Sequence, residues 1–218
     1  MGKGFRAVLF DLDGTLLDTL DDIADSMNAV LRRAGYPEHP LEAYKYFVGD
    51  GIRALVLRAL PEDRRDDAGI ETQLGAMREE YGRRWKDKTR PYAGVPKLLD
   101  ALSKRGLRMA ILSNKPENNT RSAVEALLGG WKFAEVRGAA PGGPLKPDPS
   151  GAMEISAALG IPPDEFIYLG DTGIDMKTAV GAGMYAVGAL WGFRKADELL
   201  AEGAKALIQR PEDLLRLL

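Results

Sequence analysis

The sequence of 218 residues contains no cysteine and a single histidine, and these shortages narrow the chemistry open to it. Without cysteine, disulfide frameworks, thiol nucleophiles and thiolate metal sites are excluded. Zinc sites built from several histidines are excluded as well. The one histidine, His39, stands in a turn bracketed by Pro37 and Pro40, and we expect it to be a solvated loop residue. Catalysis would therefore rest on Asp, Glu, Lys, Ser or Thr side chains and a bound cofactor.

Long hydrophobic runs and a strong excess of charge of either sign are also missing. No apolar stretch approaches the length that a bilayer requires, and the amino-terminal residues lack the apolar region of a signal peptide. The formal net charge is only −2, which gives no electrostatic basis for binding nucleic acid or an anionic membrane. We expect a cytoplasmic protein, a monomer or a homodimer, without nucleic-acid or membrane partners.

Short apolar runs that end in polar residues recur along the chain and indicate buried β-strands. These runs are Ala7–Phe10, Leu107–Leu112, Phe133–Val136, Glu165–Leu169 and Met184–Val187. Helical patterns, each closed by a glycine, lie between them at Val95–Arg105, Pro149–Leu159 and Asp175–Ala182. Strands that alternate with helices at this spacing imply right-handed crossovers and a parallel sheet. The predicted fold class is α/β, with a Rossmann-like parallel sheet and helices on both of its faces.

Residues 18–87 interrupt this alternation. The segment holds helical patterns and no convincing strand, the patterns being Leu20–Ala34, Leu41–Phe47, Ile52–Leu60 and a charged run over Asp63–Lys88. A segment of this length between two parallel strands needs structure of its own. We therefore predict a discontinuous α/β core, residues 1–17 and 88–218, with an inserted α-helical domain at residues 18–87.

Asp11 and Asp13 follow directly on the first strand, in the sequence Asp-Leu-Asp-Gly-Thr. Alternate residues of an extended segment point to the same side, so both carboxylates can reach one site. In open α/β sheets, ligands bind outside the carboxyl ends of the strands. Two carboxylates this close require a proton or a cation between them, which indicates acid chemistry, a metal or both. A plain turn is the alternative, because Asp-Gly is a common turn signal.

Polar residues also follow the later strands. Ser113 and Asn114 come after the second core strand, where they either form an anion site or cap the next helix. Lys146 stands in a loop stiffened by prolines and is either a fixed cation or a solvated side chain. Because each strand end at one edge carries a group of this kind, we interpret them as parts of one site.

Asp171 and Asp175 follow the strand Glu165–Leu169, where capping and first-turn electrostatics are the structural alternative. If Asp13 is protonated, these two acids and Asp11 contribute a charge of −3. One Mg²⁺ and Lys146 contribute +3, which leaves the site near neutral for a phosphate dianion. Oxygen ligands without histidine or cysteine favour Mg²⁺ over zinc.

With these motifs the chain resembles the haloacid dehalogenase superfamily. The matching motifs, in the expected order, are Asp11–Thr15, Ser113-Asn114, Lys146–Pro149 and Gly170–Asp175. The helical insert resembles the type-one cap of this superfamily. Within the insert, Phe47–Leu55 is similar to the substrate-facing cap loop of phosphoglycolate phosphatases, and Pro91–Val95 also fits that branch.

The resemblance implies hydrolysis through an aspartyl-phosphate. Asp11 would be the nucleophile, while Asp13 would protonate the leaving alkoxide and then activate the hydrolytic water. Mg²⁺ would be held by Asp11, the Asp13 backbone carbonyl and Asp171. Thr172 and Asp175 would support the metal from nearby.

The resemblance also assigns phosphate and substrate contacts. Ser113, the backbone amide of Asn114 and the catalytic Lys146 would hold the phosphoryl oxygens during transfer. Thr15 would brace the loop. In the cap, Gly49 would let the chain approach the leaving group closely, and Arg53 would contact the substrate.

The expected function is Mg²⁺-dependent hydrolysis of a small phosphate monoester, with 2-phosphoglycolate as a candidate substrate. A sugar phosphomutase or a pyrophosphatase of the same superfamily is the first alternative. A catalytically silent module that binds a phosphorylated ligand or a protein partner is the second. Asp13 disfavours dehalogenation, because the dehalogenase branch of the superfamily lacks an aspartate at this position.

Overall fold

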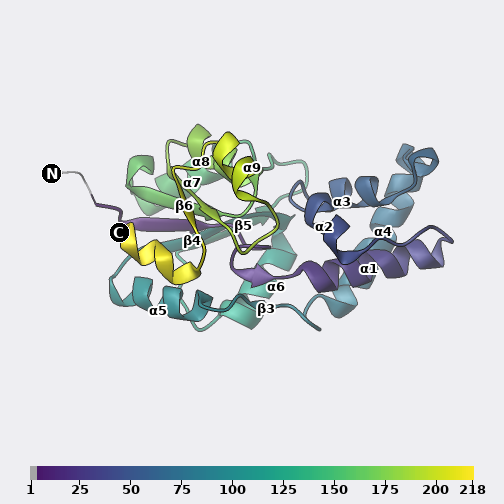
Figure 1. Cartoon of the computed structure of the whole chain (residues 1–218), viewed down its shortest axis with the longest axis horizontal. Coiled ribbons are helices and arrows are strands. Elements are labelled where there is room, and N and C mark those ends of the chain that lie inside the picture. Colours follow the sequence, from purple (N-terminus) through teal and green to yellow (C-terminus); the bar gives the residue numbers. More distant parts are fainter. Residues whose placement is uncertain (1–3) are drawn as a thin grey trace. The chain divides into compact units, whose positions relative to one another are not determined.

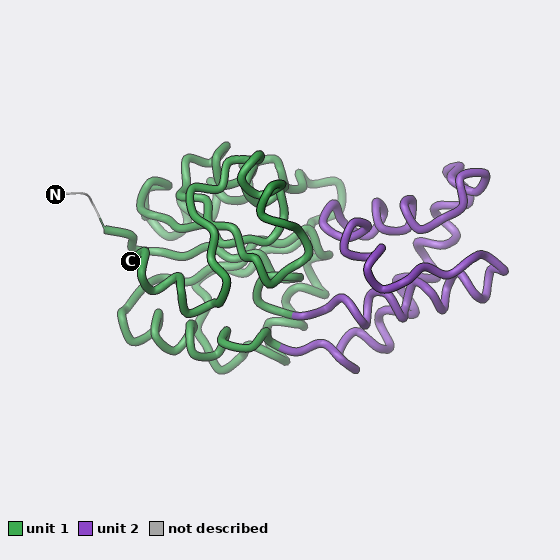
Figure 2. The backbone as a smooth tube through the Cα atoms, in the orientation of Figure 1, with its two compact units in different colours: residues 1–17, 91–218 green, residues 18–90 purple. Residues whose placement is uncertain are grey.

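The computed structural model describes residues 4–218, which form two compact units. One unit contains the chain up to Leu17 together with Pro91–Leu218, and the other contains Asp18–Arg90. Figure 2 colours the two units separately. Among the described residues, no helix combines the length and apolar character that a membrane span requires.

A parallel sheet forms the centre of the first unit, and its strand order is β5-β4-β1-β6-β7-β8. The strands are β1 (Ala7–Phe10), β4 (Arg108–Pro116), β5 (Glu135–Ala139), β6 (Phe166–Gly170), β7 (Tyr185–Ala189) and β8 (Ala206–Ile208). All registered pairs in the sheet are parallel. β1 lies between β4 and β6 and is buried along its whole length, as expected for an apolar run covered on both faces.

Helices cover both faces of this sheet. They are α5 (Val95–Lys104), α6 (Glu117–Leu128), α7 (Ser150–Leu159), α8 (Gly173–Gly181) and α9 (Ala196–Ala201), with short 3₁₀ turns η2 (Pro163–Glu165) and η3 (Pro211–Arg216). α5 and α6 lie on one face, and α7, α8 and α9 lie on the other (Figure 1). After β1, the chain adds β4 and β5 on one side of that strand. It then crosses to the other side of β1 and adds β6, β7 and β8, so the direction of strand addition reverses beside β1. Such a reversal creates the usual ligand crevice of an open α/β sheet.

This architecture confirms the predicted α/β fold class, with corrections at the element ends. β4 does not end at Leu112 but continues to Pro116, because its pairing with β5 resumes at Ala139 after an irregularity. Ser113 and Asn114 are therefore strand residues. β8 and α9 were not predicted, since each is too short to produce a clear periodic pattern.

The second unit is helical. It contains α1 (Leu20–Arg33), α2 (Leu41–Phe47), α3 (Ile52–Ala59), η1 (Glu62–Arg64) and α4 (Asp67–Arg84). α1 packs against α4, and apolar side chains such as Met27 and Met77 are buried in these two helices. The chain enters and leaves this unit through β2 (Leu17–Asp18) and β3 (Arg90–Pro91), which form a two-stranded sheet.

His39 is not the solvated loop residue that its proline-rich surroundings predict. Its Nε2 atom lies 2.8 Å from the carbonyl oxygen of Ala59, and its ring packs edge-on against Tyr44 and Phe47. Its backbone N–H donates to Asn28. The proline turn thus folds back onto the helices, and His39 is half-buried between them.

The helical unit ends at Arg90 rather than at residue 87, and the cause is Asp22 in the first turn of α1. The Asp22 carboxylate is buried and accepts hydrogen bonds from the backbone N–H groups of Lys88 and Thr89. It also accepts one from the Thr89 hydroxyl at 2.7 Å. These bonds attach the returning chain to α1.

We predict that Asp22→Ala lowers the free energy of unfolding by about 2–4 kcal/mol, because the buried N–H and hydroxyl of Thr89 and the part-buried N–H of Lys88 lose their acceptor. Urea or thermal unfolding measures the change. The neighbouring Asp21, whose side chain is 42% exposed, provides the matched control. Asp21→Ala should cost less than about 0.5 kcal/mol. Similar losses in the two variants would contradict the anchoring role of Asp22.

Candidate active site

Asp11 is held at the carboxyl end of β1 by the neighbouring strand. Its backbone N–H donates to the carbonyl of Leu169 in β6 at 3.0 Å. The side chain is buried, and its Oδ1 accepts a hydrogen bond from the Leu12 N–H at 2.7 Å. Pairing of β1 with β6 therefore fixes Asp11 beside the acids that follow β6.

Asp175 and the helix that carries it are fixed by Thr172. Thr172 is the N-cap of α8 and forms a capping box with Asp175. The Asp175 Oδ2 atom accepts hydrogen bonds from the Thr172 N–H at 3.0 Å and from its hydroxyl at 2.7 Å. The cap is thus Thr172 and not Asp171, which leaves the Asp171 carboxylate to the site.

Asp171 is enclosed by backbone and by the loop that follows Asp11. The Thr15 hydroxyl donates to Asp171 Oδ1 and the Phe193 N–H donates to Oδ2, both at 2.8 Å. A Cβ atom at Gly14 would lie 2.4 Å from Asp171 Oδ2, and one at Gly192 would lie 2.3 Å from Asp171 Cβ. Both glycines are therefore required for this packing. Thr15 was predicted to brace the loop after β1, and in the structure its hydroxyl bonds to Asp171.

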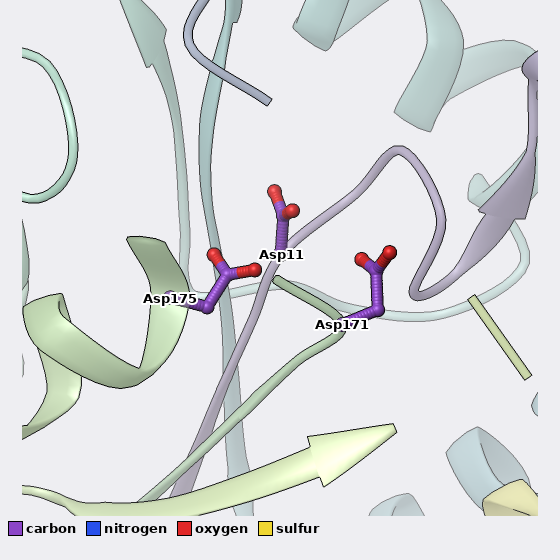
Figure 3. Close-up of side chains that lie close together, drawn as sticks. All are labelled: Asp11, Asp171 and Asp175. Carbon is purple, nitrogen blue, oxygen red and sulfur yellow. The ribbon is translucent and has the colours of Figure 1, made fainter. Parts of the chain in front are cut away.

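The three carboxylates converge, as Figure 3 shows. Asp11, Asp171 and Asp175 each offer an oxygen atom, and these atoms all lie within 4.8 Å of one another. The family resemblance implies that Asp11, Asp171 and the Asp13 backbone carbonyl hold the metal. The carboxylate cluster consists of the three acids of the charge count, while the Asp13 side chain pairs with Lys115. The Asp13 backbone carbonyl stays a predicted ligand.

Lys146 joins two of these acids. Its Nζ lies 2.7 Å from Asp11 Oδ1 and 2.7 Å from Asp175 Oδ1, and the side chain is buried. Asn114 holds the Lys146 backbone at both ends: its Nδ2 donates to the Lys146 carbonyl, and its Oδ1 accepts from the Lys146 N–H. Lys146 is therefore a fixed cation and not a solvated side chain.

Ser113 and Asn114 do not cap the following helix. α6 begins after Pro116, and no side-chain cap bond is present at that position. The Ser113 Oγ instead accepts a hydrogen bond from the Lys115 N–H at 3.2 Å. Both residues are buried at the end of β4, so the capping alternative is wrong.

Burial and charge crowding perturb the pKa values of Asp11, Asp171 and Lys146. Burial, together with the nearby charge of Asp175, raises the pKa of the Asp11 carboxyl well above its usual range. The same two causes raise the pKa of Asp171 to about 7. For Lys146, burial disfavours the charged form, but attraction to Asp11 and Asp175 outweighs burial and raises the pKa. The cluster thus contains three buried carboxylates and one ammonium, which contacts Asp11 and Asp175.

This donor set suits a metal ion. The Asp175 carboxylate is already used, since Oδ2 accepts from Thr172 and Oδ1 contacts Lys146. On Asp11, Lys146 and the Leu12 N–H both contact Oδ1, and no group within residues 4–218 donates to Oδ2. Both oxygens of Asp171 likewise accept hydrogen bonds, from Thr15 and from the Phe193 N–H, so Asp11 Oδ2 is the cluster oxygen with the fewest contacts. Oxygen donors alone suit a hard cation.

Lys115 was not among the predicted site residues. Its Nζ lies 2.8 Å from Asp13 Oδ1 and 3.1 Å from Oδ2, which forms a buried ion pair between β4 and the loop after β1. Lys115 directly follows Ser113 and Asn114 in the sequence, which indicated that it lies near the site. The direction of its side chain could not be predicted, because the continuation of β4 beyond Leu112 was not predicted.

Gly49 and Arg53 belong to the helical unit. Gly49 has a φ of +125°, which favours glycine, and it precedes α3. Arg53 lies on α3, is exposed, and forms ion pairs with Asp67 and Glu71 of α4. Their roles in substrate binding stay predictions.

Comparison with known proteins places this geometry in a family. Residues 8–189 match the sequence profile of the haloacid dehalogenase-like hydrolases, so the chain belongs to that family. Its curated relatives include two phosphoglycolate phosphatases. The one from Aquifex aeolicus is 30% identical over 98% of this chain and 96% of its own length. The one from Pseudomonas putida is 33% identical over 98% of this chain and 78% of its own length.

Solved structures agree with this assignment. A protein from Lactobacillus delbrueckii, described as a candidate phosphoglycolate phosphatase, superposes with a TM-score of 0.90, 27% identity and 97% coverage of both chains. CbbY from Rhodobacter sphaeroides, crystallised with phosphate, has the same fold, with a TM-score of 0.80, 21% identity and 96% coverage of both chains. The expected superfamily and its phosphatase class of enzyme are thereby confirmed.

We predict that Gly192→Ala lowers kcat/KM for phosphate release by about a hundredfold, because the added Cβ displaces the Asp171 carboxylate. A steady-state phosphate assay measures the loss. Gly130→Ala is the control, since a Cβ at Gly130 would meet no atom within 4 Å. Circular dichroism should show both variants folded. An unchanged rate for Gly192→Ala would mean that Asp171 tolerates displacement.

Proposed function

We propose that this protein is a Mg²⁺-dependent phosphatase that hydrolyses a small phosphate monoester through an aspartyl-phosphate on Asp11. The observation that carries the proposal is the environment of the Asp11 carboxylate. The carboxylate lies buried beside Asp171 and Asp175, with Lys146 contacting one oxygen and the other free of hydrogen bonds from any described residue. The names of the curated relatives make 2-phosphoglycolate the candidate substrate.

In the proposed reaction, an oxygen of Asp11 attacks phosphorus in line while the bond to the leaving oxygen breaks. Asp13 donates a proton to that leaving oxygen and then takes one from the water that hydrolyses the acyl phosphate. Lys146 holds a phosphoryl oxygen and keeps Asp11 oriented. Ser113 and the backbone amide of Asn114 hold the remaining phosphoryl oxygens as their charge redistributes.

Mg²⁺ is the proposed cofactor. Asp11, Asp171 and the backbone carbonyl of Asp13 would ligate it, and Asp175 and Thr172 would support these ligands. When bound, Mg²⁺ offsets the charge of the phosphate and of the carboxylates around it. The excess of acids over ammonium groups in the cluster supports this choice, because a phosphate dianion would otherwise meet a negative site.

The helical unit is proposed to act as a cap. A cap that excludes water is useful here, because monoester hydrolysis is among the slowest uncatalysed reactions. Gly49 and Arg53 would then contact the alcohol part of a small phosphorylated metabolite. The ion pairs of Arg53 with α4 would hold its guanidinium in place.

We predict that Asp11→Asn lowers phosphate release at least about a thousandfold, because the amide is a poor nucleophile of similar size. The variant should remain as stable as the unmodified protein, since it removes one of three mutually repelling carboxylates. The assay is phosphate release from 2-phosphoglycolate and other monoesters, with and without Mg²⁺. Asp164→Asn, at an exposed acid beyond the cluster, is the control. Near-normal turnover by a folded Asp11→Asn protein would refute the nucleophile assignment.

We also predict that Mg²⁺ raises the thermal midpoint by about 5–10 °C at a concentration of about 100 times its Kd. The ion binds the folded cluster and relieves its repulsion, and differential scanning calorimetry measures the shift. Asp171→Asn should abolish most of the shift, while Asp164→Asn should retain it. A full shift in Asp171→Asn would place the metal elsewhere.

A further inference from the structure

Lys115, the buried partner of Asp13, has no role in the proposed mechanism. The two side chains are 5% and 13% exposed, and the ammonium contacts both carboxylate oxygens. Lys146 already supplies the cation for the phosphoryl group through its contacts with Asp11 and Asp175. The site therefore contains a second lysine, located on the side of Asp13.

Lys115 is held rigidly. Its backbone N–H donates to Ser113 Oγ, and its carbonyl accepts a hydrogen bond from the Thr120 hydroxyl at 3.0 Å. A Cβ atom at Gly138 would lie 2.6 Å from that same carbonyl, so the neighbouring strand β5 packs directly against it. The backbone is thus fixed and the ammonium is held by Asp13, so the side chain loses little further entropy when it binds a ligand.

The position of Lys115 relative to Asp13 indicates what it can recognise. In the proposed function, on which this inference rests, Asp13 contacts the leaving oxygen of the substrate. Lys115 contacts Asp13, so it lies beside the alcohol part of the substrate and not beside the phosphoryl part. An ammonium carries three N–H donors and can serve two carboxylates, as Lys146 does with Asp11 and Asp175 in this site.

We infer that Lys115 is a specificity-determining residue that binds a carboxylate of the leaving group. The preferred substrates would then be monoesters whose alcohol carries a carboxylate close to the ester oxygen. In 2-phosphoglycolate a single methylene group separates the two, so one molecule can contact Asp13 through its ester oxygen and Lys115 through its carboxylate. A neutral alcohol would leave this contact unmade.

The experiment compares two substrates of similar size in the full chain with Mg²⁺. 2-Phosphoglycolate carries the carboxylate, and 2-hydroxyethyl phosphate replaces it with a hydroxymethyl group. Lys115→Met keeps the length of the side chain and removes its charge, while Lys115→Arg keeps the charge. Lys104→Met is the control, because Lys104 is exposed at the carboxyl end of α5.

For Lys115→Met we expect kcat/KM toward 2-phosphoglycolate to fall about a hundredfold, mainly through KM, because a charged hydrogen-bonded contact is lost. Turnover of 2-hydroxyethyl phosphate should fall less than about fivefold, which also shows that the variant is folded. Lys115→Arg should restore part of the selectivity. Lys104→Met should match the unmodified protein on both substrates.

Equal losses on the two substrates would overturn the inference, because Lys115 would then only position Asp13. Unchanged kinetics on both would overturn it as well. If Lys115→Met does not fold, Lys115→Arg and the unmodified protein decide: the kcat/KM ratio for the two substrates should be at least about tenfold in the unmodified protein and lower in Lys115→Arg, and a ratio near one or an unchanged ratio contradicts the inference. Failure of the proposed function has a different signature, namely no Mg²⁺-dependent phosphate release from either substrate.

Discussion

Repulsion among buried carboxylates is the constraint on which the rest of this site depends. Asp11, Asp171 and Asp175 come from different elements, yet their oxygen atoms lie within 4.8 Å of one another, and Lys146 offsets only one of the three charges. A cluster of this kind is unfavourable by itself, as the raised pKa values of Asp11 and Asp171 show. It persists because the surrounding fold holds each acid and because a cation can bind it.

The fold holds these acids by several independent means. Parallel pairing of β1 with β6 brings the two strand ends side by side. The capping box of Thr172 consumes one Asp175 oxygen, and Thr15 and the Phe193 amide hold Asp171. Positioning of this kind matters for phosphoryl transfer, in which the protein contributes mostly orientation and charge stabilisation.

The site contains two buried lysines, each of which pairs with different acids. Lys146 lies with the acid cluster, where the phosphoryl group is proposed to react. Lys115 pairs with Asp13, where the leaving group is proposed to depart. Each lysine is fixed through its backbone by neighbouring residues: Asn114 bonds to Lys146, while Ser113 and Thr120 bond to Lys115. The short segment at the end of β4 therefore organises both halves of the site.

The sequence by itself determined the α/β class, the parallel sheet and the acids at its carboxyl edge, because the periodicity of strands and helices and their alternation along the chain are local properties. Only the tertiary structure showed that Asp175 bonds to Thr172 and Lys146 and that the Asp13 side chain pairs with Lys115. Both depend on side-chain direction and on the extension of β4 by pairing with β5, which involve residues far apart in the sequence. A local pattern does not contain that information.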